Sequence, residues 1–178
     1  GDIVGVLETG SRPKGGALTS GEGTVSLGAE SVQSAGVINT QKFKTVPEDY
    51  AGSMRRGRLE EGDLLVYKDG GKPGNFIPHV SAFGNGFPVT KAVINEHVYR
   101  VRGVEGYSQG FLYWLLRSSW MDQEMRKRGT GVAIPGLNST NFRNLPLPVI
   151  RPEAVIALNH ALDPMLSGLL RFGAENVR

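Results

Sequence analysis

The sequence predicts an α+β domain, with a mixed, strongly looped β-sheet and flanking helices, followed by a C-terminal helix. Apolar, β-branched runs of strand length recur through the first hundred residues, whereas helical periodicity appears only after residue 108. Glycine accounts for 25 of 178 residues, about twice the usual share, which predicts many turns and functional loops. An apolar fraction of 39% is enough for one domain with its own core.

The first half of the chain is expected to form short strands between glycine-rich turns. Residues 2–7 suggest a short helix before a loop at 9–16. A polar stretch at 47–58 begins with Pro47, which suits a first helical position. The acidic residues at 60, 61 and 63 are expected to form a solvated turn before a buried strand. The strand candidates are 24–27, 37–43, 64–67, 80–83, 92–94 and 97–101.

Helical signals fill the second half. Ser108 can cap a helix that includes residues 111–116, and residues 120–128 continue or restart that helix with a basic last turn. The glycines at 129–131 then end it. Asn138 is the predicted cap of a short helix, and the alternating prolines that follow it favour an extended edge segment at 145–149.

The C-terminal segment predicts a helix with a heptad seam. Apolar residues alternate three and four positions apart at Val155, Leu158, Leu162, Met165, Leu169 and Phe172. The pattern is typical of a short coiled coil and equally of an amphipathic helix packed on its own domain. Pro164 predicts a kink, or a second helix capped by Asp163. We therefore expect a domain at 1–150 and a spacer helix for dimerisation or scaffolding at 151–178, with a break at Pro164 left open.

Composition excludes several classes of function. The absence of cysteine excludes disulfides, thiolate zinc sites, iron–sulfur clusters and cysteine nucleophiles, and agrees with a reducing compartment. The three histidines have no metal-ligand spacing, so no metal site is expected. No apolar run approaches the roughly 18 residues that span a bilayer, so we expect a soluble, cytoplasmic protein without a membrane partner. A net charge of +3 permits nucleic-acid binding without arguing for it.

One sequence match suggests catalysis. Residues 106–110 form a GxSxG motif around Ser108, and Asp122 and His160 follow in the order of an α/β-hydrolase triad. However, no apolar strand enters the motif directly and no HGGG-type oxyanion loop is present. A serine hydrolase is kept as the alternative from another class.

Glycine-rich loops that carry cations, amides and hydroxyls suggest contact with DNA. Lys and Arg neutralise phosphates, whereas Arg with guanine and Asn with adenine form paired hydrogen bonds in the major groove. The candidate DNA-binding residues of these loops are Ser11, Arg12, Lys14, Lys68, Lys72, Asn75, Arg128 and Thr130.

The order of these segments resembles the specificity subunits of type I restriction-modification enzymes, specifically one target-recognition domain with its following helix. Residues 9–13, 61–70 and 111–118 contribute to the resemblance. Its most specific part is GTGVAIPGLN at 129–138 followed by LPLP at 145–148. These segments are similar to the family's Gly-(Ser/Thr)…Ile-Pro-x-Leu-Asn…(Ile/Leu)-Pro-(Ile/Leu)-Pro signature.

The resemblance implies a non-catalytic reader of double-stranded DNA. Such a subunit directs methyltransferase (modification) subunits and the restriction nuclease subunit to one half of a bipartite site. The S-adenosylmethionine and ATP of the complex belong to those partners, so no cofactor is expected here.

Family subunits carry two recognition domains and two long helices, and 178 residues hold one of each. The chain is therefore expected to be a fragment, or a half-length subunit that forms a homodimer through the heptad seam. The recognition domain of a single-chain adenine methyltransferase is an alternative within this interpretation.

Overall fold

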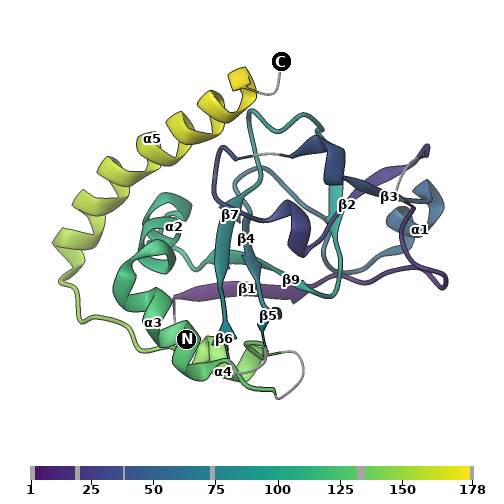
Figure 1. The fold of residues 1–178 in the computed structure, drawn as a ribbon. Helices are drawn as coiled ribbons and strands as arrows, with labels where there is room; N and C mark the ends of the chain where they lie inside the picture. Colours follow the sequence, from purple (N-terminus) through teal and green to yellow (C-terminus); the bar gives the residue numbers. More distant parts are fainter. Residues whose placement is uncertain (1–2, 19–20, 38, 73–74, 132–134, 177–178) are drawn as a thin grey trace.

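The structure is a computed structural model that describes residues 3–18, 21–37, 39–72, 75–131 and 135–176. It confirms the α+β class: helices cover one side of a central sheet, and a smaller sheet with α1 lies on the other (Figure 1). The strands are β1 (Val4–Thr9), β2 (Thr24–Leu27), β3 (Lys44–Val46), β4 (Leu64–Tyr67), β5 (Gly71–Lys72), β6 (Asn75–Phe76), β7 (His79–Ala82), β8 (Ala92–Ile94) and β9 (Val98–Gly103). The helices are α1 (Glu48–Ser53), α2 (Gln109–Arg117), α3 (Ser119–Arg128), α4 (Ser139–Arg143) and α5 (Pro152–Asn176), with 3₁₀ turns at Ala29–Ser31 and Thr40–Lys42.

The central sheet is antiparallel, in the order β1-β9-β4-β7. Its middle strand β4 is buried on both faces, which explains its unbroken apolar sequence. Leu64 and Val66 face the core beneath α2 and α3, whereas Leu65 faces a second cluster with Leu27 and Ile94 of the smaller sheet. That sheet has the order β3-β2-β8, with β2 and β8 parallel. β4 therefore packs against the helices on one face and against the smaller sheet on the other.

The predicted caps of the helices are confirmed. The Ser108 hydroxyl accepts a hydrogen bond from the Phe111 amide at 3.1 Å, and the Asn138 carboxamide oxygen accepts one from the Asn141 amide at 2.8 Å. Ser118 caps α3 in the same way, accepting from the Met121 amide at 3.2 Å, so α3 restarts rather than continues α2. These side chains satisfy amide groups that have no partner within the helix.

Two predicted elements are wrong. The helix predicted at 2–7 is absent from the described residues 3–7, because Val4–Thr9 is the edge strand β1, which pairs antiparallel with β9; residue 2 lies outside the described part. Its short apolar pattern fits either structure, and backbone pairing with β9 decides between them. The strand predicted at 37–43 contains instead a 3₁₀ turn at Thr40–Lys42, since the Asn39 side chain accepts from the Gln41 amide at 3.1 Å. Residue 38 lies outside the described part.

Helix α5 runs unbroken from Pro152 to Asn176, with Pro164 inside it. It packs on the same core as the sheet, because Leu166 and Leu170 are buried there, although neither belongs to the predicted seam. At Gly173 the helix approaches Gly36 so closely that a Cβ would lie 2.4 Å from the Gly36 carbonyl oxygen. Among the described residues, no helix is both long enough and apolar enough to cross a membrane.

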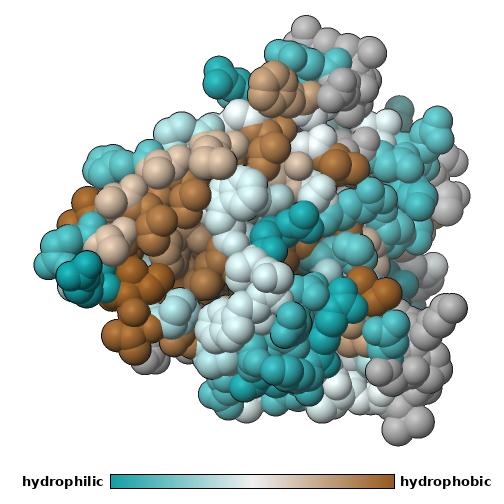
Figure 2. Space-filling model, turned by 60° about the vertical axis from the view of Figure 1, so that its left-hand side comes forward, coloured by the Kyte–Doolittle hydropathy of each residue, from teal (hydrophilic) through white to brown (hydrophobic). Residues whose placement is uncertain are grey.

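The six seam residues do not all share one environment. Val155 is buried, and Leu162 and Leu169 are half-buried against the core. The other three are exposed at 36%, 52% and 65%, namely Leu158, Met165 and Phe172. These three are seven positions apart and form one stripe along α5. Apolar side chains gather on the side of the molecule that carries α2 and α5 (Figure 2).

Candidate nucleic-acid interface

A series of polar contacts joins loops that are distant in sequence. The Lys68 ammonium lies 2.7 Å from one carboxylate oxygen of Asp69, and the other oxygen lies 2.8 Å from His97 Nδ1. His97 Nε2 lies 3.5 Å from Glu96, and Glu96 also pairs with Arg12. The loop at 10–16, the turn between β8 and β9, and the end of β4 therefore lie together.

The glycine-rich segment after α3 is attached to the same place. Thr130 and Gly136 exchange backbone hydrogen bonds of 2.8 and 2.7 Å, which close a loop whose residues 132–134 lie outside the described part. The amide of Leu137 donates to the Lys68 carbonyl at 2.6 Å. A Cβ at Gly136 would lie 2.8 Å from the Asp69 Cβ, so glycine permits this close approach. We call the surface formed by the described residues 10–16, 68–70, 95–97, 128–131 and 135–137 the loop face.

Hairpin β5–β6 extends the loop face toward α3. The Arg126 guanidinium donates to the Phe76 carbonyl at 3.2 Å, and Gly129 packs against the Phe76 ring. Asn75, next to Phe76, is exposed. The side chain of Lys72 lies outside the described part of the chain. Figure 1 shows β5, β6, α4 and the end of α3 at one edge of the molecule.

Several predicted cations are held by carboxylates. Arg12 pairs with Glu96, Lys68 with Asp69, and Arg128 with Glu124. Lys68 also lies 5.7 Å from the centre of the Tyr99 ring, within the range of a cation–π contact. Burial, followed by the charge of Asp69, raises the pKa of Tyr99 to about 12, so its hydroxyl stays protonated and donates to the Leu137 carbonyl at 3.0 Å. These contacts fix where the cations can reach.

The remaining predicted residues are accessible. Ser11 is exposed and its hydroxyl lies 2.7 Å from the Tyr50 hydroxyl of α1. Lys14 is exposed and has no ion pair within the described residues. Thr130 is exposed at the base of its loop, where the backbone pairing with Gly136 holds it. The loop face thus offers hydroxyl, amide and ammonium groups on a fixed backbone.

The acidic turn before β4 is exposed at Glu60 and Glu61, as expected, but the expectation of a solvated turn is wrong for Asp63. Asp63 is 0% exposed and accepts from the Glu60 amide at 2.7 Å, from Arg100 Nε at 2.7 Å and from Arg102 Nε. Desolvation lowers the pKa of Arg100, but the hydrogen bond to Asp63 and the nearby carboxylates outweigh it and raise that pKa. The buried ion cluster joins β9 to the turn that starts β4.

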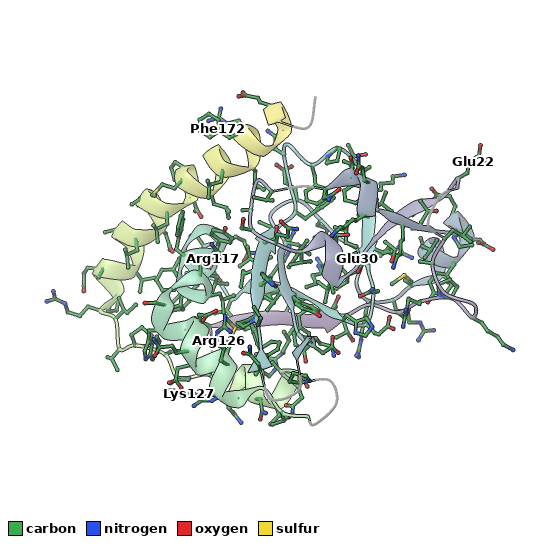
Figure 3. All side chains as sticks on the ribbon, in the orientation of Figure 1. Glu22, Glu30, Arg117, Arg126, Lys127 and Phe172 are labelled. Atoms are coloured by element: carbon green, nitrogen blue, oxygen red, sulfur yellow. The ribbon has the colours of Figure 1, made fainter. Side chains whose placement is uncertain are left out.

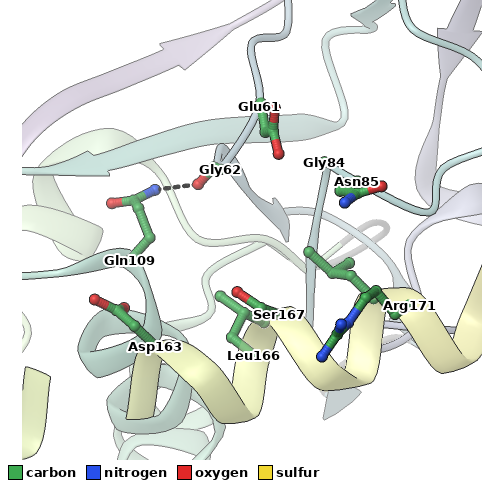
Figure 4. Close-up of a pocket in the computed structure, with 10 residues that line it drawn as sticks. Glu61, Gly62, Gly84, Asn85, Gln109, Asp163, Leu166, Ser167 and Arg171 are labelled. Atoms are coloured by element: carbon green, nitrogen blue, oxygen red, sulfur yellow. Dashed lines mark hydrogen bonds between the residues drawn. The ribbon is translucent and has the colours of Figure 1, made fainter. Parts of the chain in front are cut away.

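Gln109 supports the same turn from α2. Its amide nitrogen donates to the Gly62 carbonyl at 2.6 Å, which Figure 4 shows beside a cavity of about 350 Å³. Asp163, expected to cap a second helix, also lines this cavity and instead accepts from the Gly110 amide at 2.8 Å. The charged groups of the cavity, Glu61, Asp163 and Arg171, are all exposed to solvent. The cavity is therefore an open groove beside α5.

The GxSxG residues do not form a hydrolase triad. The Ser108 hydroxyl is used as a helix cap, and its amide donates to the Asn159 side chain at 3.1 Å. Asp122 binds Arg126 at 2.6 Å. Across the described ranges, no hydrogen bond joins Ser108 to His160. The motif terminates a loop and starts a helix.

Sequence reasoning missed one basic segment. Arg55, Arg56 and Arg58 are exposed on the turn that follows α1. Three arginines within four residues were a visible signal in the polar stretch at 47–58. What the sequence could not show is that Gly57 lies against Gly10, where the predicted basic loop begins.

Comparison with known proteins supports the fold. No protein-family model and no curated protein matches the chain. A chain from a structure concerning assembly and conformational transition of the type I R-M system is similar over 98% of this chain and 39% of its own, with a TM-score of 0.53 and 14% identity. The HsdS subunit from Thermoanaerobacter tengcongensis is similar over 98% of this chain and 41% of its own, with a TM-score of 0.43 and 14% identity.

The chain spans about two fifths of the length of these proteins. The first similarity confirms, at the level of the fold, the resemblance seen in the sequence: the chain has the fold of part of a type I R-M system component.

Proposed function

We propose that this chain recognises double-stranded DNA as one half of a type I restriction-modification specificity subunit. The observation that carries the proposal is the series of contacts from Lys68 through Asp69, His97 and Glu96 to Arg12, which gathers loops from distant parts of the sequence on one face. Base-edge recognition requires donors and acceptors in fixed positions. Loops that are joined by ion pairs and hydrogen bonds meet that requirement better than isolated basic loops.

Arg12 remains able to bind phosphate although it is paired with Glu96. The side chains of Arg12 and Glu96 are 46% and 38% exposed, and a solvent-exposed ion pair contributes only about 0–1 kcal/mol. Exchanging the Glu96 carboxylate for a phosphate oxygen therefore costs little free energy. Asn75 and Ser11 supply neutral donors and acceptors for base edges, whereas Lys14 and Lys72 supply further positive charge.

In this role the chain catalyses nothing. Methyltransferase subunits carry out adenine methylation and the nuclease subunit cuts, with S-adenosylmethionine and ATP bound by them, in the cytoplasm. The exposed stripe of α5, formed by Leu158, Met165 and Phe172, pairs with the α5 of a second copy and sets the distance between two half-sites. The other seam residues, the buried Val155 and the half-buried Leu162 and Leu169, hold α5 on its own domain.

Methylation mapping tests the proposal. Adenine methylation in the source genome is compared between cells with the gene, without it, and with a variant that carries Lys68→Ala and Asn75→Ala. We expect a split motif that disappears on deletion and is weakened or altered by the double variant. Arg151→Gln, an exposed change at the start of α5, serves as the control and leaves the motif intact. An unchanged methylation pattern after deletion would refute the function.

A second test measures binding directly. Affinity for a fluorescent duplex should fall steeply with salt, because phosphate contacts release condensed counterions. Lys72→Ala should weaken binding to all sequences, since a lysine–phosphate contact does not read bases. Binding that does not depend on salt would contradict this interpretation.

A further inference from the structure

The turn between α1 and β4 carries three arginines within four residues, outside the predicted loops. Arg55, Arg56 and Arg58 are all exposed, and none forms an ion pair within the described residues. The predicted cations Arg12 and Lys68 are, by contrast, each held by a carboxylate. We call residues 54–59 the arginine turn.

The backbone of the arginine turn is fixed at both ends and in its middle. Met54 and Leu59 are buried, in two different hydrophobic clusters. The Gly57 carbonyl accepts from the Ile94 amide at 2.8 Å, and the Gly57 amide donates to Glu8 at 3.2 Å. Gly57 has a φ of +76°, a conformation that favours glycine. The exposed arginines are therefore carried by a rigid support, and the Arg58 guanidinium also donates to the Gly52 carbonyl of α1.

The arginine turn adjoins the loop face. A Cβ at Gly57 would lie 2.6 Å from the Gly10 Cα, and the Gly10 amide donates to the Asn95 carbonyl at 3.2 Å. Gly10 begins the loop that carries Arg12 and Lys14, and Asn95 precedes Glu96. Two loops with free cations thus share one backbone contact.

Neighbouring charges leave this region positive. Lys91 is exposed and lines a surface hollow with Arg58 and Glu48. Glu48 forms no ion pair within the described residues, and the Asp49 carboxylate accepts from the Tyr50 amide at 2.8 Å. Counting Glu8, which accepts from the Gly57 amide, the four cations Arg55, Arg56, Arg58 and Lys91 stand against three nearby carboxylates, those of Glu8, Glu48 and Asp49.

We propose that the arginine turn is a second anion-binding site, which grips the phosphate backbone of duplex DNA beside the segment read by the loop face. This inference rests on the proposed function. Unpaired arginines give up no carboxylate when they bind phosphate, and a rigid support lowers the entropic cost of binding. The site contributes affinity to every sequence, while discrimination between sequences stays with the loop face.

The test measures how binding depends on salt. The full chain is titrated against a fluorescent 30-base-pair duplex at several KCl concentrations, and the logarithm of the affinity is plotted against that of the salt concentration. Each lost phosphate contact reduces the slope by about 0.9, so the triple variant Arg55→Gln, Arg56→Gln, Arg58→Gln should lose about 2–3 from its magnitude.

Two further variants control the result. The triple variant Arg117→Gln, Arg151→Gln, Arg171→Gln removes the same charge from exposed arginines on or next to α2 and α5, across the central sheet from α1 (Figures 1 and 3). It should keep the wild-type slope within about 0.5. A triple lysine replacement in the arginine turn keeps the charge and should restore most of the slope, which separates loss of phosphate contacts from loss of folding.

The outcomes distinguish the two proposals. Wild-type binding with an equal slope in the arginine-turn and control glutamine variants overturns this inference and leaves the proposed function standing. A lysine variant that behaves like the glutamine variant, with an unchanged melting temperature, also counts against a phosphate site. Absence of any salt-sensitive duplex binding by the wild type overturns both.

Discussion

Replacing Asp63 with asparagine tests whether the buried ion cluster holds the scaffold together. Asp63 is 0% exposed and binds Arg100, which is 12% exposed, and Arg102, which is 31% exposed. Removing one partner of a buried ion pair costs about 3–5 kcal/mol, because the charge left behind is uncompensated. Glu60 lies 3.2 and 3.4 Å from the two arginines and compensates in part. We therefore expect a loss of about 3 kcal/mol, at the lower end of that range.

Urea unfolding followed by circular dichroism measures this loss. For a chain of this size, about 3 kcal/mol corresponds to a melting temperature lower by roughly 6–12 °C. Glu60→Gln is the matched control: its carboxylate contacts the same two arginines but is 66% exposed, so the expected cost is below about 1 kcal/mol. If Asp63→Asn costs no more than Glu60→Gln, the cluster does not stabilise the fold and the reasoning fails.

Three further outcomes are expected. Phe172→Glu should abolish self-association in light scattering without lowering the melting temperature. Leu170→Ala, which removes a buried contact, should instead lower the free energy of unfolding in urea by about 2–5 kcal/mol. A monomeric wild type would contradict the pairing of α5. Ser108→Ala should destabilise α2 by about 1 kcal/mol, and neither it nor the wild type should react with a fluorophosphonate probe. Desolvation, followed by the charges of Arg117 and Arg126, lowers the pKa of His79 in the folded chain from its usual value of 6.5. Because the unfolded chain then binds the proton more tightly, stability should fall as the pH drops below 6.5 toward the folded pKa. His79→Gln should flatten that part of a pH–stability curve.

Local sequence patterns were sufficient to predict those elements whose structure depends on neighbours in the sequence. The caps at Ser108 and Asn138 follow from side chains that lie within three residues of the amides they bind. The continuous apolar sequence of β4 required burial on both faces, and both faces are covered. By contrast, residues 4–9 carry a pattern too short to separate a helix from an edge strand, and pairing with β9 decides the matter.

Long-range partners explain what the sequence could not show. The burial of Asp63 could not be predicted from its neighbours in sequence, because Arg100 and Arg102, which neutralise it, lie 37 and 39 residues away. The arginine turn was not predicted to bind because its contact with Gly10 joins segments on different elements. The heptad seam predicted a single face, but α5 has two apolar faces, one of which contains Leu166 and Leu170 and is buried against the core.

Under the proposed function, Gly136 and Leu137 of the sequence signature and the candidate DNA-binding residue Asn75 are expected to perform different tasks, and this separation makes a last prediction. Gly136 and Leu137 attach the loop after α3 to the end of β4, so Gly136→Ala introduces a Cβ 2.8 Å from the Asp69 Cβ and 3.0 Å from the Lys68 carbonyl oxygen. Overpacking of this kind costs about 1–3 kcal/mol, and the displaced Lys68 should weaken duplex binding as well.

Asn75→Ala alters an exposed side chain, so it should change the melting temperature little while changing which duplexes are preferred. Melting and binding measured on both variants should therefore show a joint loss for Gly136→Ala and a loss in binding alone for Asn75→Ala. If instead Gly136→Ala weakened binding alone and Asn75→Ala lowered both binding and the melting temperature, the loop segment after α3, rather than the hairpin β5–β6, would contact the bases.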